Sequence, residues 1–97
     1  DTSQLLVEAS YKYKTIVRLK GGDPFIFGRG GEEAIHLNKY SVPFEIVPGI
    51  SSSVGAPSYA GIPVTHRNIA RSVTFITGHQ AKGKDEIRWE KYADLET

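Results

Sequence analysis

Cysteine is absent from this sequence of 97 residues. A chain without thiols has no disulfide framework, no cysteine-bound zinc or iron–sulfur centre and no thiol nucleophile. The three histidines that remain are a thin set of ligands for a metal site. We therefore expect this chain to work without a metal.

An excess of either charge is also lacking, since 12 Lys and Arg residues stand against 11 Asp and Glu residues. Nucleic-acid-binding domains usually show a clear basic excess, so we expect no nucleic-acid partner. No apolar run approaches the roughly 20 residues needed to cross a bilayer, and no secretory leader is visible, which predicts a cytoplasmic protein that does not bind membranes. Methionine is missing too. We therefore expect the chain to be a piece of a longer protein.

The hydrophobic residues, 39% of the chain, suffice for one domain with a core. Their spacing alternates between helical and strand-like periods. Helices are predicted at 2–13 (capped by Thr2 or Ser3), 32–40 and 86–95, with a short, interrupted one within 50–59. Strands are predicted at 15–20, 44–47 and 72–77, and an exposed loop at 81–85. This order favours an α/β fold with a mainly parallel sheet.

Three loops follow the predicted strands, at 21–23, 48–51 and 78–79, and all are rich in glycine and polar groups. In open α/β sheets, ligands bind beyond the carboxyl ends of the strands. The sequence therefore predicts one ligand-binding rim made from these loops.

The first of these loops reads Gly21-Gly22-Asp23-Pro24. It matches neither G-x-G-x-x-G nor G-x-x-x-x-G-K-[ST], and the carboxylate of Asp23 would repel a phosphate. A carboxylate beside bare backbone suits hydroxyls, an ammonium or another cationic centre, all of which S-adenosylmethionine offers. The alternative is a tight turn in which Asp23 is only a local cap, and for an isolated tetrapeptide this alternative is the stronger one.

Arg29 stands between glycines, which predicts an exposed guanidinium able to grip a carboxylate in bidentate fashion. The alternative is a solvated pair with Glu32 or Glu33 at the start of the next helix, and for this motif alone it is the stronger one. Two later motifs, T-H-R at 65–67 and T-G-H at 77–79, add cationic or titratable groups. A histidine by itself is more often structural than catalytic. No nucleophile motif supports a hydrolase triad.

Four blocks of this sequence resemble the uroporphyrinogen-III C-methyltransferases, a branch of the tetrapyrrole methylases. The blocks are VRLKGGDPFIFGRGGEE at 17–33, VPFEIVPGISS at 42–52, YAGIPVTHR at 59–67 and SVTFITGH at 72–79. The resemblance implies a tetrapyrrole methylase-like α/β fold, of which the chain is a fragment. Residues 1–66 would belong to the N-terminal domain, with its cofactor and substrate loops, and residues 67–97 would start the C-terminal domain.

The resemblance also implies a reaction, the transfer of two methyl groups from S-adenosylmethionine to C2 and C7 of uroporphyrinogen III, giving precorrin-2 on the route to siroheme and cobalamin. No metal is needed, because the sulfonium is already an activated electrophile. The full-length protein would be a homodimer. The fragment is expected to be inactive alone, because the cofactor cleft needs both domains and an N-terminal glycine-rich loop that is not in this sequence.

Site residues follow from the same resemblance, position by position. Those implied to bind the cofactor are Gly21, Gly22, Asp23, Ile26, Ser51 and Ser52. Those implied to be catalytic are Arg29 and Glu32, and those implied to bind the substrate are Arg67 and His79. Arginines suit a substrate that carries eight carboxylates. The residue that accepts the pyrrole proton is not identified.

Two other functions fit the same residues. One is methylation of a later precorrin by an enzyme of the same fold, although the run FGRGGEE favours the first branch. The other is a nucleotide-binding α/β module without catalysis, which needs only the generic rim. A substrate test on the full-length protein separates methylation of uroporphyrinogen III from methylation of a later precorrin. Binding of a nucleotide in place of S-adenosylmethionine would indicate the non-catalytic module.

Overall fold

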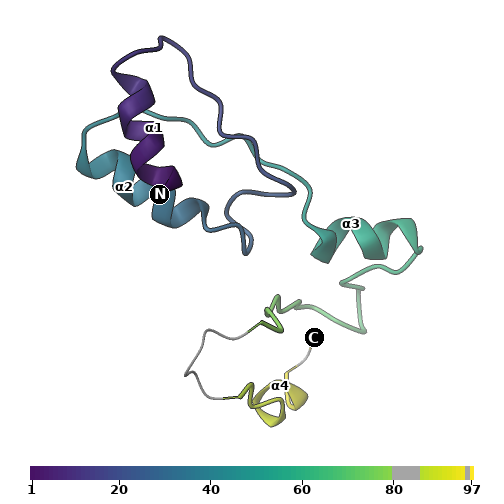
Figure 1. Cartoon of the computed structure of the whole chain (residues 1–97). Helices are drawn as coiled ribbons and strands as arrows, with labels where there is room; N and C mark the ends of the chain where they lie inside the picture. Colours follow the sequence, from purple (N-terminus) through teal and green to yellow (C-terminus); the bar gives the residue numbers. More distant parts are fainter. Residues whose placement is uncertain (80–85, 96) are drawn as a thin grey trace. The chain divides into compact units, whose positions relative to one another are not determined.

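The computed structural model describes residues 1–79, 86–95 and 97. The described residues form the helices α1 (Thr2–Ser10), α2 (Gly30–Lys39), α3 (Ser52–Tyr59) and α4 (Glu90–Ala93) (Figure 1). The chain divides into two compact units, Asp1–Ser51 and Ser52–Thr97.

Helix α1 begins with a cap that the sequence analysis assigned to the wrong residue. The Oδ1 atom of Asp1, not a hydroxyl of Thr2 or Ser3, accepts a hydrogen bond of 2.9 Å from the backbone N–H of Ser3. The helix ends at Ser10 rather than residue 13, because the amide of Tyr11 bonds back only three residues, to Glu8. A tightened last turn of this kind is common at helix ends.

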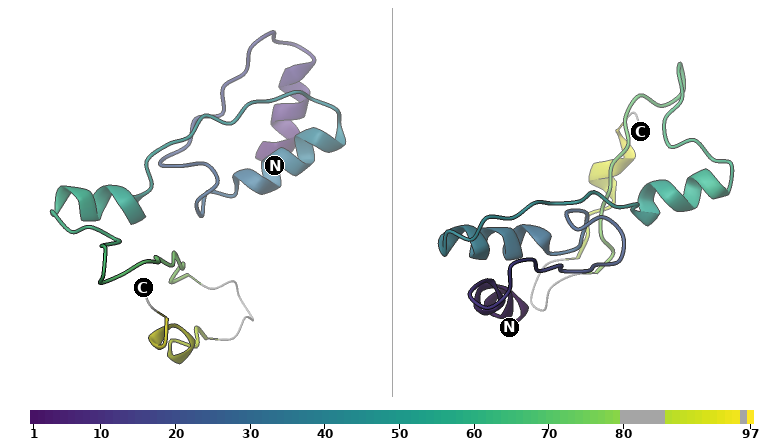
Figure 2. Two further views of the ribbon diagram at one scale, coloured as in Figure 1. Left: turned by 180° about the vertical axis from the view of Figure 1, so that it is seen from behind. Right: turned by 90° about the horizontal axis from the view of Figure 1, so that it is seen from above.

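Helices α1 and α2 pack against each other, and the two further views show them crossing side by side (Figure 2). Val7 on α1 is 1% exposed, the most buried apolar residue described. On α2, the ring nitrogen Nε2 of His36 lies 3.1 Å from the side-chain oxygen of Gln4, and its ring lies 5.0 Å from that of Tyr40. This packing fixes the direction of α2, whose first turn carries charged groups of the site.

Helix α2 starts two residues before the predicted 32–40, at Gly30. Arg29, the residue before it, has a φ of 58° and makes no side-chain capping hydrogen bond. Glu32 and Glu33 lie in the first turn, as predicted, where the positive end of the helix dipole favours carboxylates.

The predicted strands are not confirmed. Among the described residues the only β-pairing is an isolated antiparallel bridge between His66 and Ala70, and 15–20, 44–47 and 72–77 run without ladder bonds. Their apolar side chains stay open to solvent: Val17 is 79% exposed and Leu19 is 84% exposed. A strand exists only where a neighbouring backbone pairs with it, so a favourable local pattern does not make one. The mainly parallel sheet is therefore not confirmed, although the helices are in the expected order.

The second unit holds α3 and α4. Helix α3 runs through Pro57, which was expected to interrupt it, and the carbonyl oxygen of Pro57 accepts a 2.8 Å hydrogen bond from Ile62 N–H beyond the helix end. Helix α4 is only four residues long, so the helix predicted over 86–95 was too long. The loop predicted at 81–85 lies outside the described residues. No helix among the described residues has the length and apolar character of a membrane span.

Candidate functional site

Asp23 joins two loops of the first unit. Its Oδ1 atom accepts a 2.8 Å hydrogen bond from the backbone N–H of Phe25, two residues on. Its Oδ2 atom accepts a 3.1 Å bond from the N–H of Gly49, 26 residues away. The first bond is the local cap anticipated for this turn, and the second brings together two of the three loops expected at one rim. The third, 78–79, lies in the second unit.

Gly49 is the point of closest approach between these loops. A Cβ atom on Gly49 would overlap the carbonyl oxygen of Gly22 and lie 2.7 Å from its carbonyl carbon. Both are backbone atoms that cannot turn away, so only glycine fits. Gly22 itself has a φ of +76°, a left-handed conformation that favours glycine. Asp23, Gly49 and Gly22 form what we call the loop junction. Gly49 belongs to the loop 48–51 that was expected at the rim, but the sequence gave this residue no role of its own.

A backbone hydrogen bond to the carbonyl oxygen of Pro24 closes the loop between the loop junction and α2. The N–H of Gly30 donates a 3.0 Å hydrogen bond to that oxygen, and a Cβ on Gly30 would overlap it. Phe27 and Arg29 both take positive φ values, 52° and 58°. Non-glycine residues adopt this conformation only where the surroundings enforce it. The closed loop leaves the side chain of Arg29 81% exposed at the start of α2.

Arg29 pairs with Glu32 on the surface of α2. Its Nη2 and Nε atoms donate to the same carboxylate oxygen, Oε2, at 2.9 and 3.1 Å. The side chain of Glu32 is 65% exposed. The hydrogen bond to Glu32, together with its charge, raises the pKa of Arg29 above its usual value. The solvated pair anticipated for this motif is therefore present, and it links the two residues implied to be catalytic.

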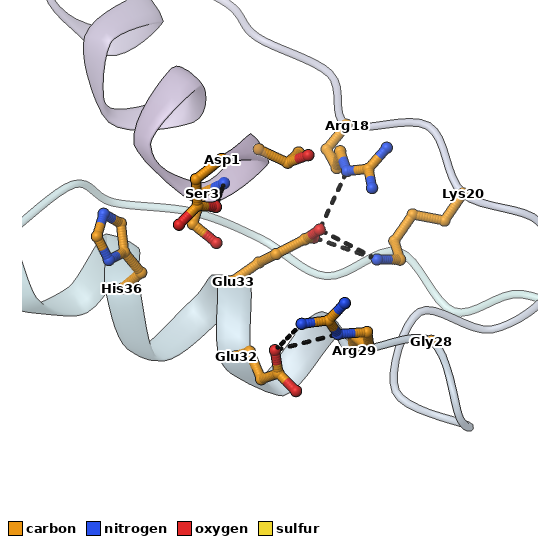
Figure 3. Close-up of a pocket in the computed structure, with 10 residues that line it drawn as sticks. Asp1, Ser3, Arg18, Lys20, Gly28, Arg29, Glu32, Glu33 and His36 are labelled. Atoms are coloured by element: carbon orange, nitrogen blue, oxygen red, sulfur yellow. Dashed lines mark hydrogen bonds and ion pairs between the residues drawn. The ribbon is translucent and has the colours of Figure 1, made fainter. Parts of the chain in front are cut away.

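A second set of ion pairs, which sequence reasoning missed, lies beside the first (Figure 3). The Oε1 atom of Glu33 lies 3.2 Å from Nε of Arg18 and 3.2 Å from Nζ of Lys20, and Lys20 also reaches Oε2 at 3.3 Å. Lys20 and Glu33 are 13% and 14% exposed, and Arg18 is 42% exposed. We call these three residues the Glu33 cluster. Burial raises the pKa of Glu33, but the hydrogen bonds from Lys20 and Arg18 outweigh it and leave that pKa below its usual value.

Both ion-pair groups line one open pocket of about 610 Å³ in the first unit. In Figure 3 the side chains of Arg18 and Lys20 come down from the chain before the glycine loop, Glu33 extends from α2 toward them, and Glu32 lies at the lower edge of α2 beside Arg29. Three basic side chains and three carboxylates line this pocket, and the basic ones can bind a ligand carboxylate with any donors that the wall's own carboxylates leave free.

The other residues implied by the resemblance are spread over both units. Ile26 is half-buried, and its N–H donates to the carbonyl oxygen of Asp23 at 3.3 Å. A Cβ on Gly21 would meet no atom within 4 Å, so this backbone is open to a ligand. Ser51 ends the first unit. The remaining three belong to the second unit: Ser52, Arg67 and His79.

Within the second unit, local backbone contacts surround two of these residues. The carbonyl oxygen of Arg67 lies 2.8 Å from Nδ1 of His66, and the N–H of His79 donates to the hydroxyl of Thr77 at 3.3 Å. Helix α3 starts at Ser52. Among the described residues no three His, Asp or Glu side chains gather as metal ligands would.

The solved structures and curated proteins similar to this chain include uroporphyrin(ogen)-III C-methyltransferases and siroheme synthases. One similar solved structure is a uroporphyrin-III C-methyltransferase from Thermus thermophilus, crystallised in complex with S-adenosylhomocysteine. Its sequence is 36% identical to this chain, and its fold matches with a TM-score of 0.77. The match covers 97% of this chain and 39% of that one. A uroporphyrinogen-III C-methyltransferase of Methanocaldococcus jannaschii is 54% identical over 86 residues, which are 89% of this chain and 36% of the relative.

A siroheme synthase of Saccharophagus degradans is 52% identical over 92 residues, 95% of this chain and 20% of that protein. The chain thus spans between a fifth and two fifths of the length of these relatives. The sequence profile of the tetrapyrrole (corrin/porphyrin) methylases matches residues 1–97, so the chain belongs to the tetrapyrrole methylase family.

Proposed function

We propose that the full-length protein containing these residues is a uroporphyrinogen-III C-methyltransferase, which uses S-adenosylmethionine to methylate C2 and C7 and gives precorrin-2. The observation that carries this proposal is the likeness, over 97% of the chain, to a methyltransferase solved with S-adenosylhomocysteine. The curated relatives named for the same reaction or for siroheme synthesis support it.

The cofactor side of the proposed site rests on the loop junction. The backbone at Gly21 is open, and the two oxygens of Asp23, each already accepting one backbone N–H, keep lone pairs for a hydroxyl or an ammonium. These residues fit a ligand that carries both groups. We propose that Gly21, Gly22, Asp23, Ile26, Ser51 and Ser52 bind S-adenosylmethionine. The bound sulfonium would supply an activated methyl group without help from a metal.

The substrate side rests on arginine. The Nη1 atom of Arg29 takes no part in the bonds to Glu32, so the guanidinium can grip a carboxylate while Glu32 holds its orientation. We propose the same role for Arg67, with His79 as a hydrogen-bonding partner. As the new carbon–carbon bond forms and the methyl–sulfur bond breaks, the pyrrole N–H must lose its proton. Residues 1–66 would belong to one domain and 67–97 to the next, and the homodimer stays a prediction.

The test is methyl transfer by the full-length protein under anaerobic conditions. With isotopically labelled S-adenosylmethionine and uroporphyrinogen III, mass spectrometry should show two labelled methyl groups on each tetrapyrrole. Methylation of a later precorrin but not of uroporphyrinogen III would assign the protein to another branch of the family. Binding of a nucleotide without any methyl transfer would overturn the proposal.

A further inference from the structure

We propose that Glu33 is a positioning residue, which holds Arg18 and Lys20 as a two-cation clamp for one carboxylate of the tetrapyrrole. The inference rests on the proposed function, because it takes a polycarboxylate as the ligand. It adds three residues to a substrate side that so far consists of Arg29, Arg67 and His79.

The Glu33 cluster carries an uncompensated positive charge. Two cations, Arg18 and Lys20, share a single carboxylate at 3.2 Å each. Lys20 and Glu33 are largely shielded from solvent, at 13% and 14% exposure, so salt and water screen this charge less than one on an open surface. A carboxylate from a ligand would compensate the remaining positive charge of Arg18 and Lys20.

The two cations are also aimed in one direction. They stand two residues apart on an extended segment, and side chains at that spacing point to the same side. The Nε atom of Arg18 donates a hydrogen bond to Glu33, and its Nη1 atom donates to the carbonyl oxygen of Leu19 at 3.3 Å. In the part of the chain that the structure describes, Nη2 of Arg18 makes no hydrogen bond. Lys20 has three donors and gives two to Glu33. Each cation therefore keeps a donor.

The clamp shares its pocket with other charged groups. Arg18 and Lys20 line the same pocket as Arg29. Two further carboxylates lie on its wall: Glu32 is paired with Arg29, and Asp1 keeps its negative charge while it accepts a hydrogen bond from the backbone N–H of Ser3. An anion would therefore bind through the spare donors of Arg18 and Lys20 and not because of the net charge of the pocket. His36, also on the wall, contacts the side-chain oxygen of Gln4.

Glu33 would strengthen binding by ordering the clamp in advance. Long side chains such as Lys and Arg lose rotamer freedom when they grip a ligand, and a carboxylate that already holds them removes most of that loss. If Glu33 were only a structural ion pair, its removal would lower stability without changing the affinity of folded protein for the substrate. The two roles therefore differ in what they do to KM.

The experiment compares Glu33→Gln with Glu8→Gln, which changes an exposed glutamate on α1, in the full-length protein. For Glu33→Gln we expect KM for uroporphyrinogen III to rise by about three- to tenfold, with kcat and the Kd for S-adenosylhomocysteine unchanged. Lys20→Gln removes a contact outright and should raise KM by roughly ten- to a hundredfold, and raised salt should weaken substrate binding less than in wild type. Glu8→Gln should behave as wild type.

An unchanged KM in Glu33→Gln, in active and folded protein, would overturn the positioning role of Glu33, and an unchanged KM in Lys20→Gln would overturn the clamp; either result would leave the proposed function standing. Failure of the wild-type protein to methylate uroporphyrinogen III would instead overturn the proposed function, and the clamp with it. If Glu33→Gln does not fold, Lys20→Gln decides the question alone: a raised KM supports the clamp and an unchanged KM refutes it.

Discussion

Glu32 and Glu33 are consecutive residues in the first turn of α2, yet their ion pairs differ in solvent exposure and in the sequence separation of the partners. Glu32 meets Arg29, three residues away, and both side chains are mostly exposed, at 65% and 81%. Glu33 meets cations 13 and 15 residues away, and its own side chain is 14% exposed. Solvent screens the first pair, while the second ties a distant segment to the helix.

The difference separates two tasks. A solvated pair costs little to rearrange, and under the proposed function Arg29 turns its unused Nη1 atom to a ligand carboxylate while Nε and Nη2 stay with Glu32. The Glu33 cluster and the loop junction join parts of the chain that are far apart in sequence, and the Glu33 cluster also lies on the wall of the pocket. Loss of these contacts should therefore lower the stability by different amounts, most at the loop junction and least at the exposed pair.

The largest loss of stability is expected at the loop junction from Gly49→Ala. The added methyl group would overlap the backbone of Gly22, so the two loops must part, at a cost of about 3 kcal/mol. Gly31→Ala is the matched control, because a Cβ there meets nothing within 4 Å and alanine favours a helix. Denaturant unfolding of the two full-length variants measures the difference. Equal stability of the two would show that the loops do not touch.

Asp23→Asn should cost less than Gly49→Ala, about 1.5–3 kcal/mol of unfolding free energy. The amide keeps one acceptor oxygen, but its NH₂ group cannot accept the second backbone N–H, so one of the bonds to Phe25 and Gly49 is lost. Asp94→Asn, at an exposed carboxylate in the second unit, is the control. Should both variants unfold at the same denaturant concentration, the carboxylate of Asp23 would not join the loops.

Glu33→Gln should lower stability by about 1 kcal/mol at pH 7, and by less in acid. Because the pKa of Glu33 is lower in the folded state, its stabilising effect is present above the unfolded value, 4.5, and is lost as pH falls through the folded value. The gap between wild type and variant should therefore close below about pH 4.5. Unfolding curves at several pH values, with Glu8→Gln as reference, test this. A gap that stays constant with pH would contradict the ion pairs.

The smallest change is expected for the exposed pair. Glu32→Gln should leave the melting temperature of the full-length protein unchanged, at low and at high salt, because solvent already screens Arg29 and Glu32. A fall in melting temperature as large as that caused by Glu33→Gln would show that the exposed pair stabilises the fold as much as the Glu33 cluster does.

The sequence predicted helices better than strands, for a physical reason. The hydrogen bonds of α2 lie within one stretch of chain, so its acidic first turn and apolar spacing suffice to place it within two residues. A strand at 15–20 depends on a partner backbone elsewhere, and nothing in its own residues supplies one. The cap of α1 was misassigned by one or two residues because Asp1, Thr2 and Ser3 are all good capping residues.

The site shows the same limit. The bond from Phe25 to Asp23 is local and was anticipated as a cap before Pro24, whereas the bond from Gly49 spans 26 residues and left no local trace. For the Glu33 cluster a signal did exist. Basic residues at 18 and 20 share one side of an extended segment, and a carboxylate on the next helix is a natural partner for both. As an ion pair, sequence reasoning considered Glu33 only with Arg29.

Under the proposed function, the loop junction binds the cofactor and the arginines bind the substrate. Calorimetric titration of the full-length protein with S-adenosylhomocysteine tests it most directly, in wild type, Asp23→Ala and Arg29→Ala. We predict that Asp23→Ala weakens binding by roughly ten- to a hundredfold, the worth of a charge-assisted hydrogen bond, while Arg29→Ala binds as wild type does. Normal binding by Asp23→Ala, or no binding by wild type, would contradict the assignment of the loop junction to the cofactor.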